Sequence, residues 1–233
     1  MNVPVPTILH EDNHLLAVVK PAGLLVQGDR SGDPSLLDVC KAYLKTAYGK
    51  PGNVFLGLVH RLDRPVSGVV LLARTSKAAS RLSAQFRERS VHKTYLAVVE
   101  GVPPETGGTL VHHLADRADA GGRTRCAATP FDGSRQGRLS YRTLAGDARR
   151  TLLRVEPETG RRHQIRAQLA AVGCPVAGDI KYGASSRRPD RSIALHAWRL
   201  SCRHPVGGAA LVLTAPPPSG GPWLEIPSDE TGT

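Results

Sequence analysis

The chain has 233 residues, of which 40% are hydrophobic and only 4% aromatic, and 31 Lys and Arg against 20 Asp and Glu give it a formal net charge of +11. This length and hydrophobic fraction predict one globular, catalytic-sized domain and exclude a disordered chain, except at the ends. The excess of positive charge favours a polyanionic partner, with nucleic acid ahead of a membrane surface.

The first half of the chain predicts strands that alternate with amphipathic helices. Apolar runs bounded by Pro and Gly are typical of strands, and apolar residues recurring every three or four positions behind Ser or Thr are typical of a capped helix. The expected elements are strands at 15–19 and 24–26, a helix from the N-cap Ser35 to before Gly49, a buried strand at 68–73, and a helix behind Thr75 and Ser76.

The second half predicts further strands around one helix. Strict alternation over 94–99 places Tyr95 on a defined face of a strand. Residues 101–138 are rich in Gly, Pro, Arg and small polar residues, which predicts a long excursion that can contain a hairpin and has no assigned role. The remaining expected elements are antiparallel strands within 138–144 and 149–157, a helix within 162–173 that Gly173 ends, and strands within 193–202 and 210–216.

The cysteines and the termini limit the class of protein further. Four widely separated cysteines without a C-x-x-C pair predict reduced thiols rather than zinc ligands or a disulfide framework. The first residues lack the pattern of a leader, and no apolar run is long enough to cross a bilayer, so we expect a cytoplasmic protein without a membrane partner. We expect a catalytic domain at 1–215 and a Pro/Gly-rich tail at 216–233.

Charged motifs stand in otherwise apolar surroundings. The segment "GLVHRLDRPVSGVVLLAR" at 57–74 places Asp63 between Arg61 and Arg64. A carboxylate in such a run is costly to bury and needs partners that hold it. In "TGRRHQIR" at 159–166, Arg162 and Arg166 are four positions apart, which predicts a shared helix face with two guanidiniums.

These motifs resemble those of the RluA-type RNA pseudouridine synthases, whose signature reads H-R-L-D-x-x-T-S-G where this chain has "HRLDRPVSG" at 60–68. The matches follow the order of the family and span roughly residues 8–215, so together they are far more specific than one short motif. Val66 stands where the signature has Thr, and Gln27 stands where His is frequent. The further matching motifs are "KPAGLLV" at 20–26, "KTYLAVVEG" at 93–101, "TGRRHQIRAQL" at 159–169, "GDIKYG" at 178–183 and "LHAWRLSCRHP" at 195–205.

The resemblance implies a fold and a reaction. The family fold is α+β, with a mixed, mostly antiparallel central sheet flanked by helices and loops. The family breaks the N1 glycosidic bond of a uridine in rRNA or tRNA and rejoins the uracil through C5, without a cofactor or a metal. The S4-like RNA-binding domain of many members is not expected here, and a monomer is the default expectation.

The resemblance also assigns catalytic residues. Asp63 corresponds to the catalytic aspartate, and its role as nucleophile or as base stays open because a carboxylate suits either task. Arg166 is expected to pair with Asp63 and keep it ionised. Tyr95 is expected to lie against the uracil.

The substrate must be turned out of its stack before the reaction, at a cost of a few kcal/mol. Arg61 is suited to fill the gap, since a guanidinium stacks on bases and donates hydrogen bonds. The other expected substrate-binding residues are His60 for orientation, Arg64 and Arg162 for phosphates, and Ile165 and Leu195 for an apolar wall.

Other interpretations stay open. Asp63 alone would more often be a structural carboxylate in the turn before Pro65, and Tyr95 alone a core tyrosine. The whole chain could be an RNA-binding module without activity, or a glycosylase that releases free uracil. Asp63→Asn should leave the biological effect of a binding module intact but abolish pseudouridine formation by an isomerase. A glycosylase would release free uracil, whereas an isomerase retains the uracil in the RNA.

Overall fold

The computed structural model describes residues 5–219 and 223. The chain divides into two compact units, of which unit 1 contains 1–92 and 197–216, and unit 2 contains 93–196 and 217–233. The expected catalytic domain at 1–215 is not tested by this division and stays a prediction. Most of the expected tail at 216–233 lies outside the described residues.

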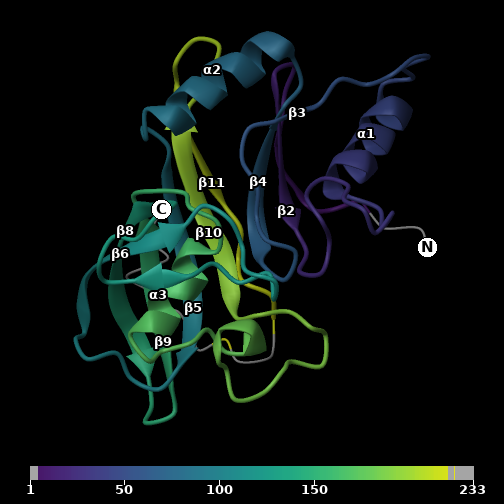
Figure 1. Ribbon diagram of the computed structural model, residues 1–233. Coiled ribbons are helices and arrows are strands. Elements are labelled where there is room, and N and C mark those ends of the chain that lie inside the picture. The colour runs from purple at the N-terminus through teal and green to yellow at the C-terminus, as the bar shows by residue number, and fades with distance from the viewer. Residues whose placement is uncertain (1–4, 220–222, 224–233) are drawn as a thin grey trace. The chain divides into compact units, whose positions relative to one another are not determined.

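Unit 1 is a mostly antiparallel sheet with two helices, and its strands β2 and β4 lie side by side (Figure 1). The strands follow each other in space as β1-β2-β4-β10, with β3 paired to β4 and β11 paired to β10. The elements are β1 (Ile8–Glu11), β2 (Leu15–Lys20), α1 (Leu36–Ala47), β3 (Gly57–Leu58), β4 (Ser67–Ala73), α2 (Ser76–Arg87), most of β10 (Leu195–Arg203), and β11 (Ala210–Thr214).

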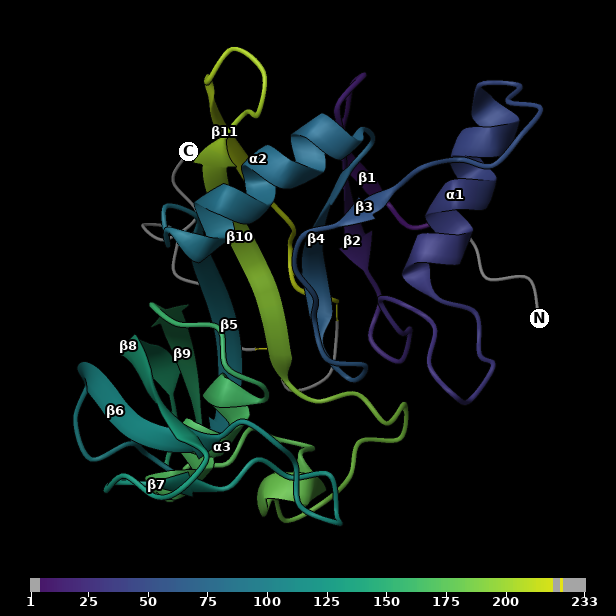
Figure 2. The same cartoon turned by 45° about the horizontal axis from the view of Figure 1, so that its top comes forward.

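The core of unit 1 lies between one face of the sheet and α2, which begins near one end of β4 and passes in front of β10 in Figure 2. The register pairs Leu15 with Ala73 and Ala17 with Leu71, so alternate residues of β2 and β4 point toward the helix. All seven residues of β4 are buried, which explains why its sequence is continuously apolar from Val69 to Ala73 rather than alternating. The buried cluster contains Leu15, Ala17, Val69, Leu71, Ala73, Ala78, Leu82, Val91, Leu200, Cys202, Leu213 and Ala215.

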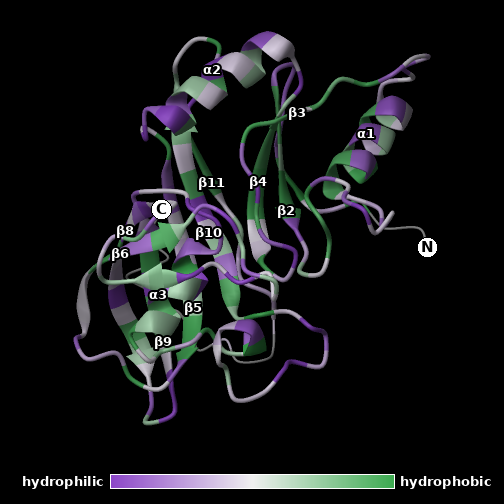
Figure 3. Ribbon diagram, viewed as in Figure 1, coloured by the Kyte–Doolittle hydropathy of each residue, from purple (hydrophilic) through white to green (hydrophobic). Residues whose placement is uncertain are grey.

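Both helices of unit 1 begin where the sequence predicts. The Ser35 hydroxyl accepts the N–H of Asp38, whose carboxylate accepts the N–H of Ser35, so α1 starts with a capping box. The Thr75 hydroxyl accepts the N–H of Ala78 at the start of α2. Figure 3 shows hydrophobic and hydrophilic stretches alternating along α2, as expected for a helix with one face in the core.

Unit 2 is an antiparallel sheet with one helix and a short 3₁₀ turn. Its strand order is β5-β9-β8-β6-β7. The elements are β5 (His92–Glu100), β6 (Gly107–Ala115), β7 (Cys126–Ala127), β8 (Ser134–Gly146), β9 (Arg150–Pro157), α3 (Gln164–Ala171) and η1 (Ile180–Tyr182). The α+β class and the mixed, mostly antiparallel sheet are therefore confirmed.

The strand predicted at 24–26 is wrong, and the excursion at 101–138 holds more regular structure than its composition predicts. Residues 24–26 form an irregular segment with an isolated bridge from Leu25 to Ser35, because the backbone N–H groups of Leu36 and Leu37 bind the carbonyls of Leu25 and Val26 in place of a neighbouring strand. The excursion at 101–138 contains the nine-residue strand β6, which pairs with β8 over its whole length. Its polar composition hid the strand because most of β6 is exposed or only half-buried.

All four cysteines are free thiols in the structure, and three of them are buried. Burial raises the pKa of Cys40 to about 12, so this thiol stays protonated. No helix in the described part of the chain has both the length and the apolar character needed to span a bilayer.

Gly68→Ala is expected to destabilise the protein by about 3 kcal/mol. Gly68 has a φ of 120°, and a Cβ placed on it would lie 2.3 Å from the carbonyl oxygen of Ala197 and 2.5 Å from its nitrogen. Backbone atoms on a neighbouring strand cannot move aside cheaply. Thermal unfolding measures the loss, and Gly28→Ala, where an added Cβ meets nothing within 4 Å, is the matched control.

Candidate active site

The loop between β3 and β4 carries Asp63, and its backbone is fixed at several points. The N–H of Val66 binds the carbonyl of Asp63 at 3.1 Å, which closes a tight turn. The N–H of Gly23 binds the carbonyl of Arg64 at 2.8 Å, so this loop is joined to the turn that follows β2. Asp63 itself is half-buried. The turn therefore holds the carboxylate at a set place while leaving it partly open to solvent.

Lys20, at the end of β2, is the residue that ties the two loops together. Its side chain is fully buried, and Nζ donates to the carbonyl oxygens of Pro21 at 2.9 Å, Leu24 at 2.8 Å and Arg64 at 3.2 Å. Burial lowers the pKa of Lys20 to about 7, an effect that the negative charge of Asp63 opposes. Lys20 thus fixes the conformation of both loops through its hydrogen bonds. Its buried amine also interacts electrostatically with the carboxylate of Asp63.

Lys20→Met is expected to remove a pH-dependent part of the stability. Below about pH 7 Lys20 is charged in the folded and unfolded chain alike, so the full cost of burying the charge is present. From about pH 7 to 10.5 the folded chain loses this proton first, and wild-type stability rises by up to about 1.4 kcal/mol per pH unit. Denaturant unfolding at several pH values should show the difference between wild type and variant shifting in favour of the wild type.

The matched control for this prediction is Lys77→Met, since Lys77 is exposed on α2. Removing this exposed amine leaves the buried amine of Lys20 in place, so the pH-dependent rise in stability should persist in Lys77→Met. A pH-independent difference for Lys20→Met would show that Lys20 keeps an ordinary pKa in the folded chain.

Of the sequence neighbours of Asp63, some have side chains that are bound within the fold, and one has a side chain that is exposed to solvent. His60 has a structural contact, because its Nε2 accepts the N–H of Leu71 at 2.9 Å and its ring stacks on Phe86 at 4.9 Å. Arg64 donates to the carbonyl of Gly23 at 2.9 Å and to the carboxylate of Asp33 at 2.7 Å. Arg61 is exposed. An exposed guanidinium beside a fixed carboxylate is the kind of side chain that can reach a nucleic acid.

In unit 2, Arg166 on α3 is bound by Asp179 through a two-point fork. Nε lies 2.6 Å from Oδ2 and Nη2 lies 2.9 Å from Oδ1, and the two side chains are only 5% and 2% exposed. The bidentate geometry fixes the plane of the guanidinium and holds its charge in a dry place. Asp179 is the carboxylate that the structure places on Arg166 within unit 2.

The guanidinium of Arg166 also lies over the aromatic ring of Tyr182. The centre of the guanidinium lies 5.1 Å from the centre of the Tyr182 ring. The Tyr182 hydroxyl accepts the N–H of Thr124 at 2.7 Å and lies 2.8 Å from Nδ1 of His163, and burial raises the pKa of this hydroxyl. Since Asp179 and Tyr182 are three residues apart around a 3₁₀ turn, the "GDIKYG" segment presents both to the same side chain.

The expected helix face shared by Arg162 and Arg166 is wrong. The helix begins at Gln164, because His163 has a φ of 51°, a left-handed conformation that a right-handed helix cannot contain. Arg162 lies before the helix and donates to the carbonyl of Gly122 at 3.3 Å, whereas Arg166 is buried. The two guanidiniums therefore do not lie on one face of a helix.

The other residues expected in the site lie as follows. Tyr95 is half-buried in β5, opposite Val155 of β9, so the predicted strand is confirmed. Ile165 and Leu195 are buried, as an apolar wall requires. Asp63, His60, Arg61 and Arg64 belong to unit 1, and Tyr95, Arg162, Ile165, Arg166 and Leu195 belong to unit 2. The expected pairing of Asp63 with Arg166 stays a prediction.

Sequence reasoning missed the roles of Lys20, Asp179 and Tyr182. Each stands in a segment that the sequence marks. Lys20 ends an apolar strand and is followed by the "PAG" turn, and Asp179 and Tyr182 belong to the motif "GDIKYG". A lysine that continues an apolar run is a candidate for burial, and its short-range partners can be the carbonyls of the following turn. The distant partner Arg166 could not be read from the sequence.

This fold and these motifs define an enzyme class that acts on RNA rather than a structural module. A model of the RNA pseudouridylate synthase family matches residues 14–171. The chain belongs to the RNA pseudouridylate synthase family, which are isomerases that modify RNA, and the resemblance to its RluA-type members is confirmed.

Individual relatives agree with this assignment. The ribosomal large subunit pseudouridine synthase D of Nitrosomonas europaea is 36% identical over 223 residues, which cover 91% of this chain and 62% of the relative. The tRNA pseudouridine synthase C of Yersinia pestis is 36% identical over 229 residues, which cover 89% of this chain and 85% of the relative. The chain therefore spans less than two thirds of the first relative.

Solved structures give the same fold. The human RNA pseudouridylate synthase domain containing 4 has a TM-score of 0.76 and 27% identity, covering 91% of this chain and 89% of that chain. The human RNA pseudouridylate synthase domain containing 1 has a TM-score of 0.71 and 27% identity, covering 93% and 86%. The expected pseudouridine synthase fold is confirmed.

Proposed function

We propose that this chain converts uridines of rRNA or tRNA to pseudouridine and that Asp63 is its catalytic aspartate. The observation that supports this best is the fixed loop around Asp63, where a buried Lys20 and a closed turn hold a half-buried carboxylate within the "HRLD" motif. A carboxylate held in this way is available either to add to a sugar carbon or to take a proton, and it needs little reorganisation to act.

The reaction is an isomerisation with balanced atoms. The bond between N1 of the uracil and C1′ breaks, a bond from C5 to C1′ forms, the C5 proton leaves, and N1 ends as N–H. No redox partner or energy-rich nucleotide is consumed. We propose that Tyr95 and Arg166 take part in this reaction, as the family motifs imply, with Arg166 oriented by Asp179 and Tyr182.

The remaining residues are proposed to bind the RNA. The net charge of +11 favours a polyanion, and the exposed Arg61 is suited to contact a nucleotide. We propose that the protein works in the cytoplasm as a monomer. The proposed substrate-binding residues are Arg61, His60, Arg64, Arg162, Ile165 and Leu195.

RNA carrying C5-tritiated uridine tests the reaction. Release of tritium to water with the uracil retained in the RNA is the expected result. Release of free uracil would show a hydrolytic glycosylase, and binding without either product would show a module without activity. The two kinds of relatives named above point to both rRNA and tRNA, so mapping of pseudouridine in all stable RNAs with and without the gene identifies the target.

A further inference from the structure

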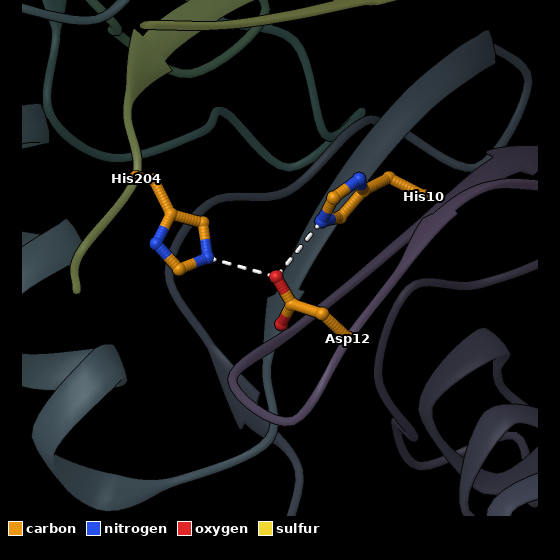
Figure 4. A group of neighbouring side chains, drawn as sticks. All are labelled: His10, Asp12 and His204. Carbon is orange, nitrogen blue, oxygen red and sulfur yellow. Dashed lines mark hydrogen bonds and ion pairs between the residues drawn. The ribbon is translucent and has the colours of Figure 1, made fainter. Parts of the chain in front are cut away.

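Three side chains that the proposed reaction does not use converge in unit 1. His10 belongs to β1, Asp12 follows β1 directly, and His204 follows β10, 192 residues after Asp12. Nε2 of His10 lies 3.0 Å from Oδ2 of Asp12, and Nε2 of His204 lies 2.8 Å from the same oxygen (Figure 4). Among the residues that the structure describes, no other group of three His, Cys, Asp or Glu side chains brings its ligand atoms together in this way.

The carboxylate of Asp12 is oriented by backbone groups. Its Oδ1 accepts the N–H of His14 at 2.7 Å and the N–H of Leu15 at 2.7 Å, which turns Oδ2 toward the two imidazoles. Nδ1 of His204 contacts both backbone groups of Val206: in the tautomer with a hydrogen on Nδ1 it donates a hydrogen bond to the carbonyl oxygen, and in the other tautomer it accepts the N–H of Val206 at 3.1 Å. A backbone carbonyl on the second nitrogen is the usual support of a metal-binding histidine, because it leaves the lone pair of Nε2 for the ion.

The three ligand atoms have the spacing of a small coordination sphere. All of them lie within 4.8 Å of one another. Ligands at about 2.0–2.2 Å from a tetrahedral Zn²⁺ are roughly 3.3 Å apart, so small side-chain rotations would admit the ion. The side chains of His10 and Asp12 are 31% and 32% exposed and that of His204 is 16% exposed, which leaves a route from solvent.

The chemistry of the donors selects among metals. Two imidazole nitrogens and one carboxylate oxygen suit Zn²⁺, which often takes three protein ligands and one water, whereas Mg²⁺ and Ca²⁺ prefer sites made of oxygen atoms. We propose that His10, Asp12 and His204 bind one Zn²⁺ ion. The ion joins the turn after β1 to the end of β10 and thereby stabilises unit 1.

The test begins with untagged wild-type protein stripped of metal by a chelator. One equivalent of Zn²⁺ should raise the unfolding temperature by about 5 °C when it saturates the site, and Mg²⁺ should not. One equivalent of Co²⁺ should give the visible absorption bands of a four-coordinate ion with nitrogen and oxygen ligands. Absence of Zn²⁺ binding by calorimetry to the wild-type protein would overturn the proposal without any variant.

Variants locate the site. His10→Ala and His204→Ala should each lose the zinc-dependent rise in unfolding temperature and the Co²⁺ bands. His14→Ala is the matched control and should keep both, because the His14 ring lies near His204, with 6.1 Å between ring centroids, and is outside the cluster of ligand atoms. An unchanged zinc response in His10→Ala and His204→Ala would place the metal elsewhere and overturn the proposal.

Discussion

Asp63→Asn is expected to lower pseudouridine formation by roughly 10³-fold or more, because an amide can neither capture a sugar carbon nor accept a proton as a carboxylate does. Asn keeps the size of Asp, so the turn closed by the Asp63 carbonyl and the N–H of Val66 should persist. Tritium release from C5-labelled RNA under single-turnover conditions measures the effect.

RNA binding and folding separate a chemical role of Asp63 from a structural one. The affinity for RNA should stay the same or rise slightly, since the variant removes a negative charge from a protein with a net charge of +11. The unfolding temperature should also stay close to the wild-type value. Asp29→Asn, an exposed carboxylate in unit 1, is the matched control and should keep full activity. Unchanged tritium release by Asp63→Asn would rule out its proposed role.

Local physics explains which elements could be predicted. The strand β4 and the helix α2 were correctly expected because their signals are short-range, a continuous apolar run and a Thr cap followed by apolar residues four apart. Strand β6 was missed because a strand at the edge of a core is defined by its partner β8, and its own residues are mostly polar. The segment at 24–26 has the apolar residues of a strand, but its carbonyls bind the first N–H groups of α1 instead of a neighbouring strand.

The candidate site was predictable in its motifs and not in its contacts. The "HRLD" and "GDIKYG" segments could be recognised, yet the burial of Lys20 depends on the carbonyl of Arg64, 44 residues further along the chain, as well as on carbonyls of its own turn. The left-handed residue His163, which moves Arg162 off the helix, has no signal in the residue type, because glycine is the usual residue there. The sequence therefore does not predict contacts between residues far apart in the chain, such as Lys20 and Arg64, or a single residue with a positive φ, such as His163.

Asp179→Ala is expected to destabilise the protein by about 3–5 kcal/mol, because it removes the carboxylate that binds the buried guanidinium of Arg166 through two hydrogen bonds. Chemical denaturation followed by circular dichroism measures this loss. The matched control is Asp116→Ala, which breaks the pair of Asp116 with Arg135, whose side chains are 43% and 62% exposed. That change should cost about 1 kcal/mol or less.

A double variant separates stability from activity at the same pair. Arg166→Met combined with Asp179→Leu replaces two buried charges by apolar side chains of similar volume and should recover most of the stability lost in Asp179→Ala. If Arg166 takes part in the reaction, tritium release should stay low in this stable protein, because no apolar side chain supplies a fixed positive charge. Full activity in the stable double variant would show that the fork of Arg166 and Asp179 serves the fold alone.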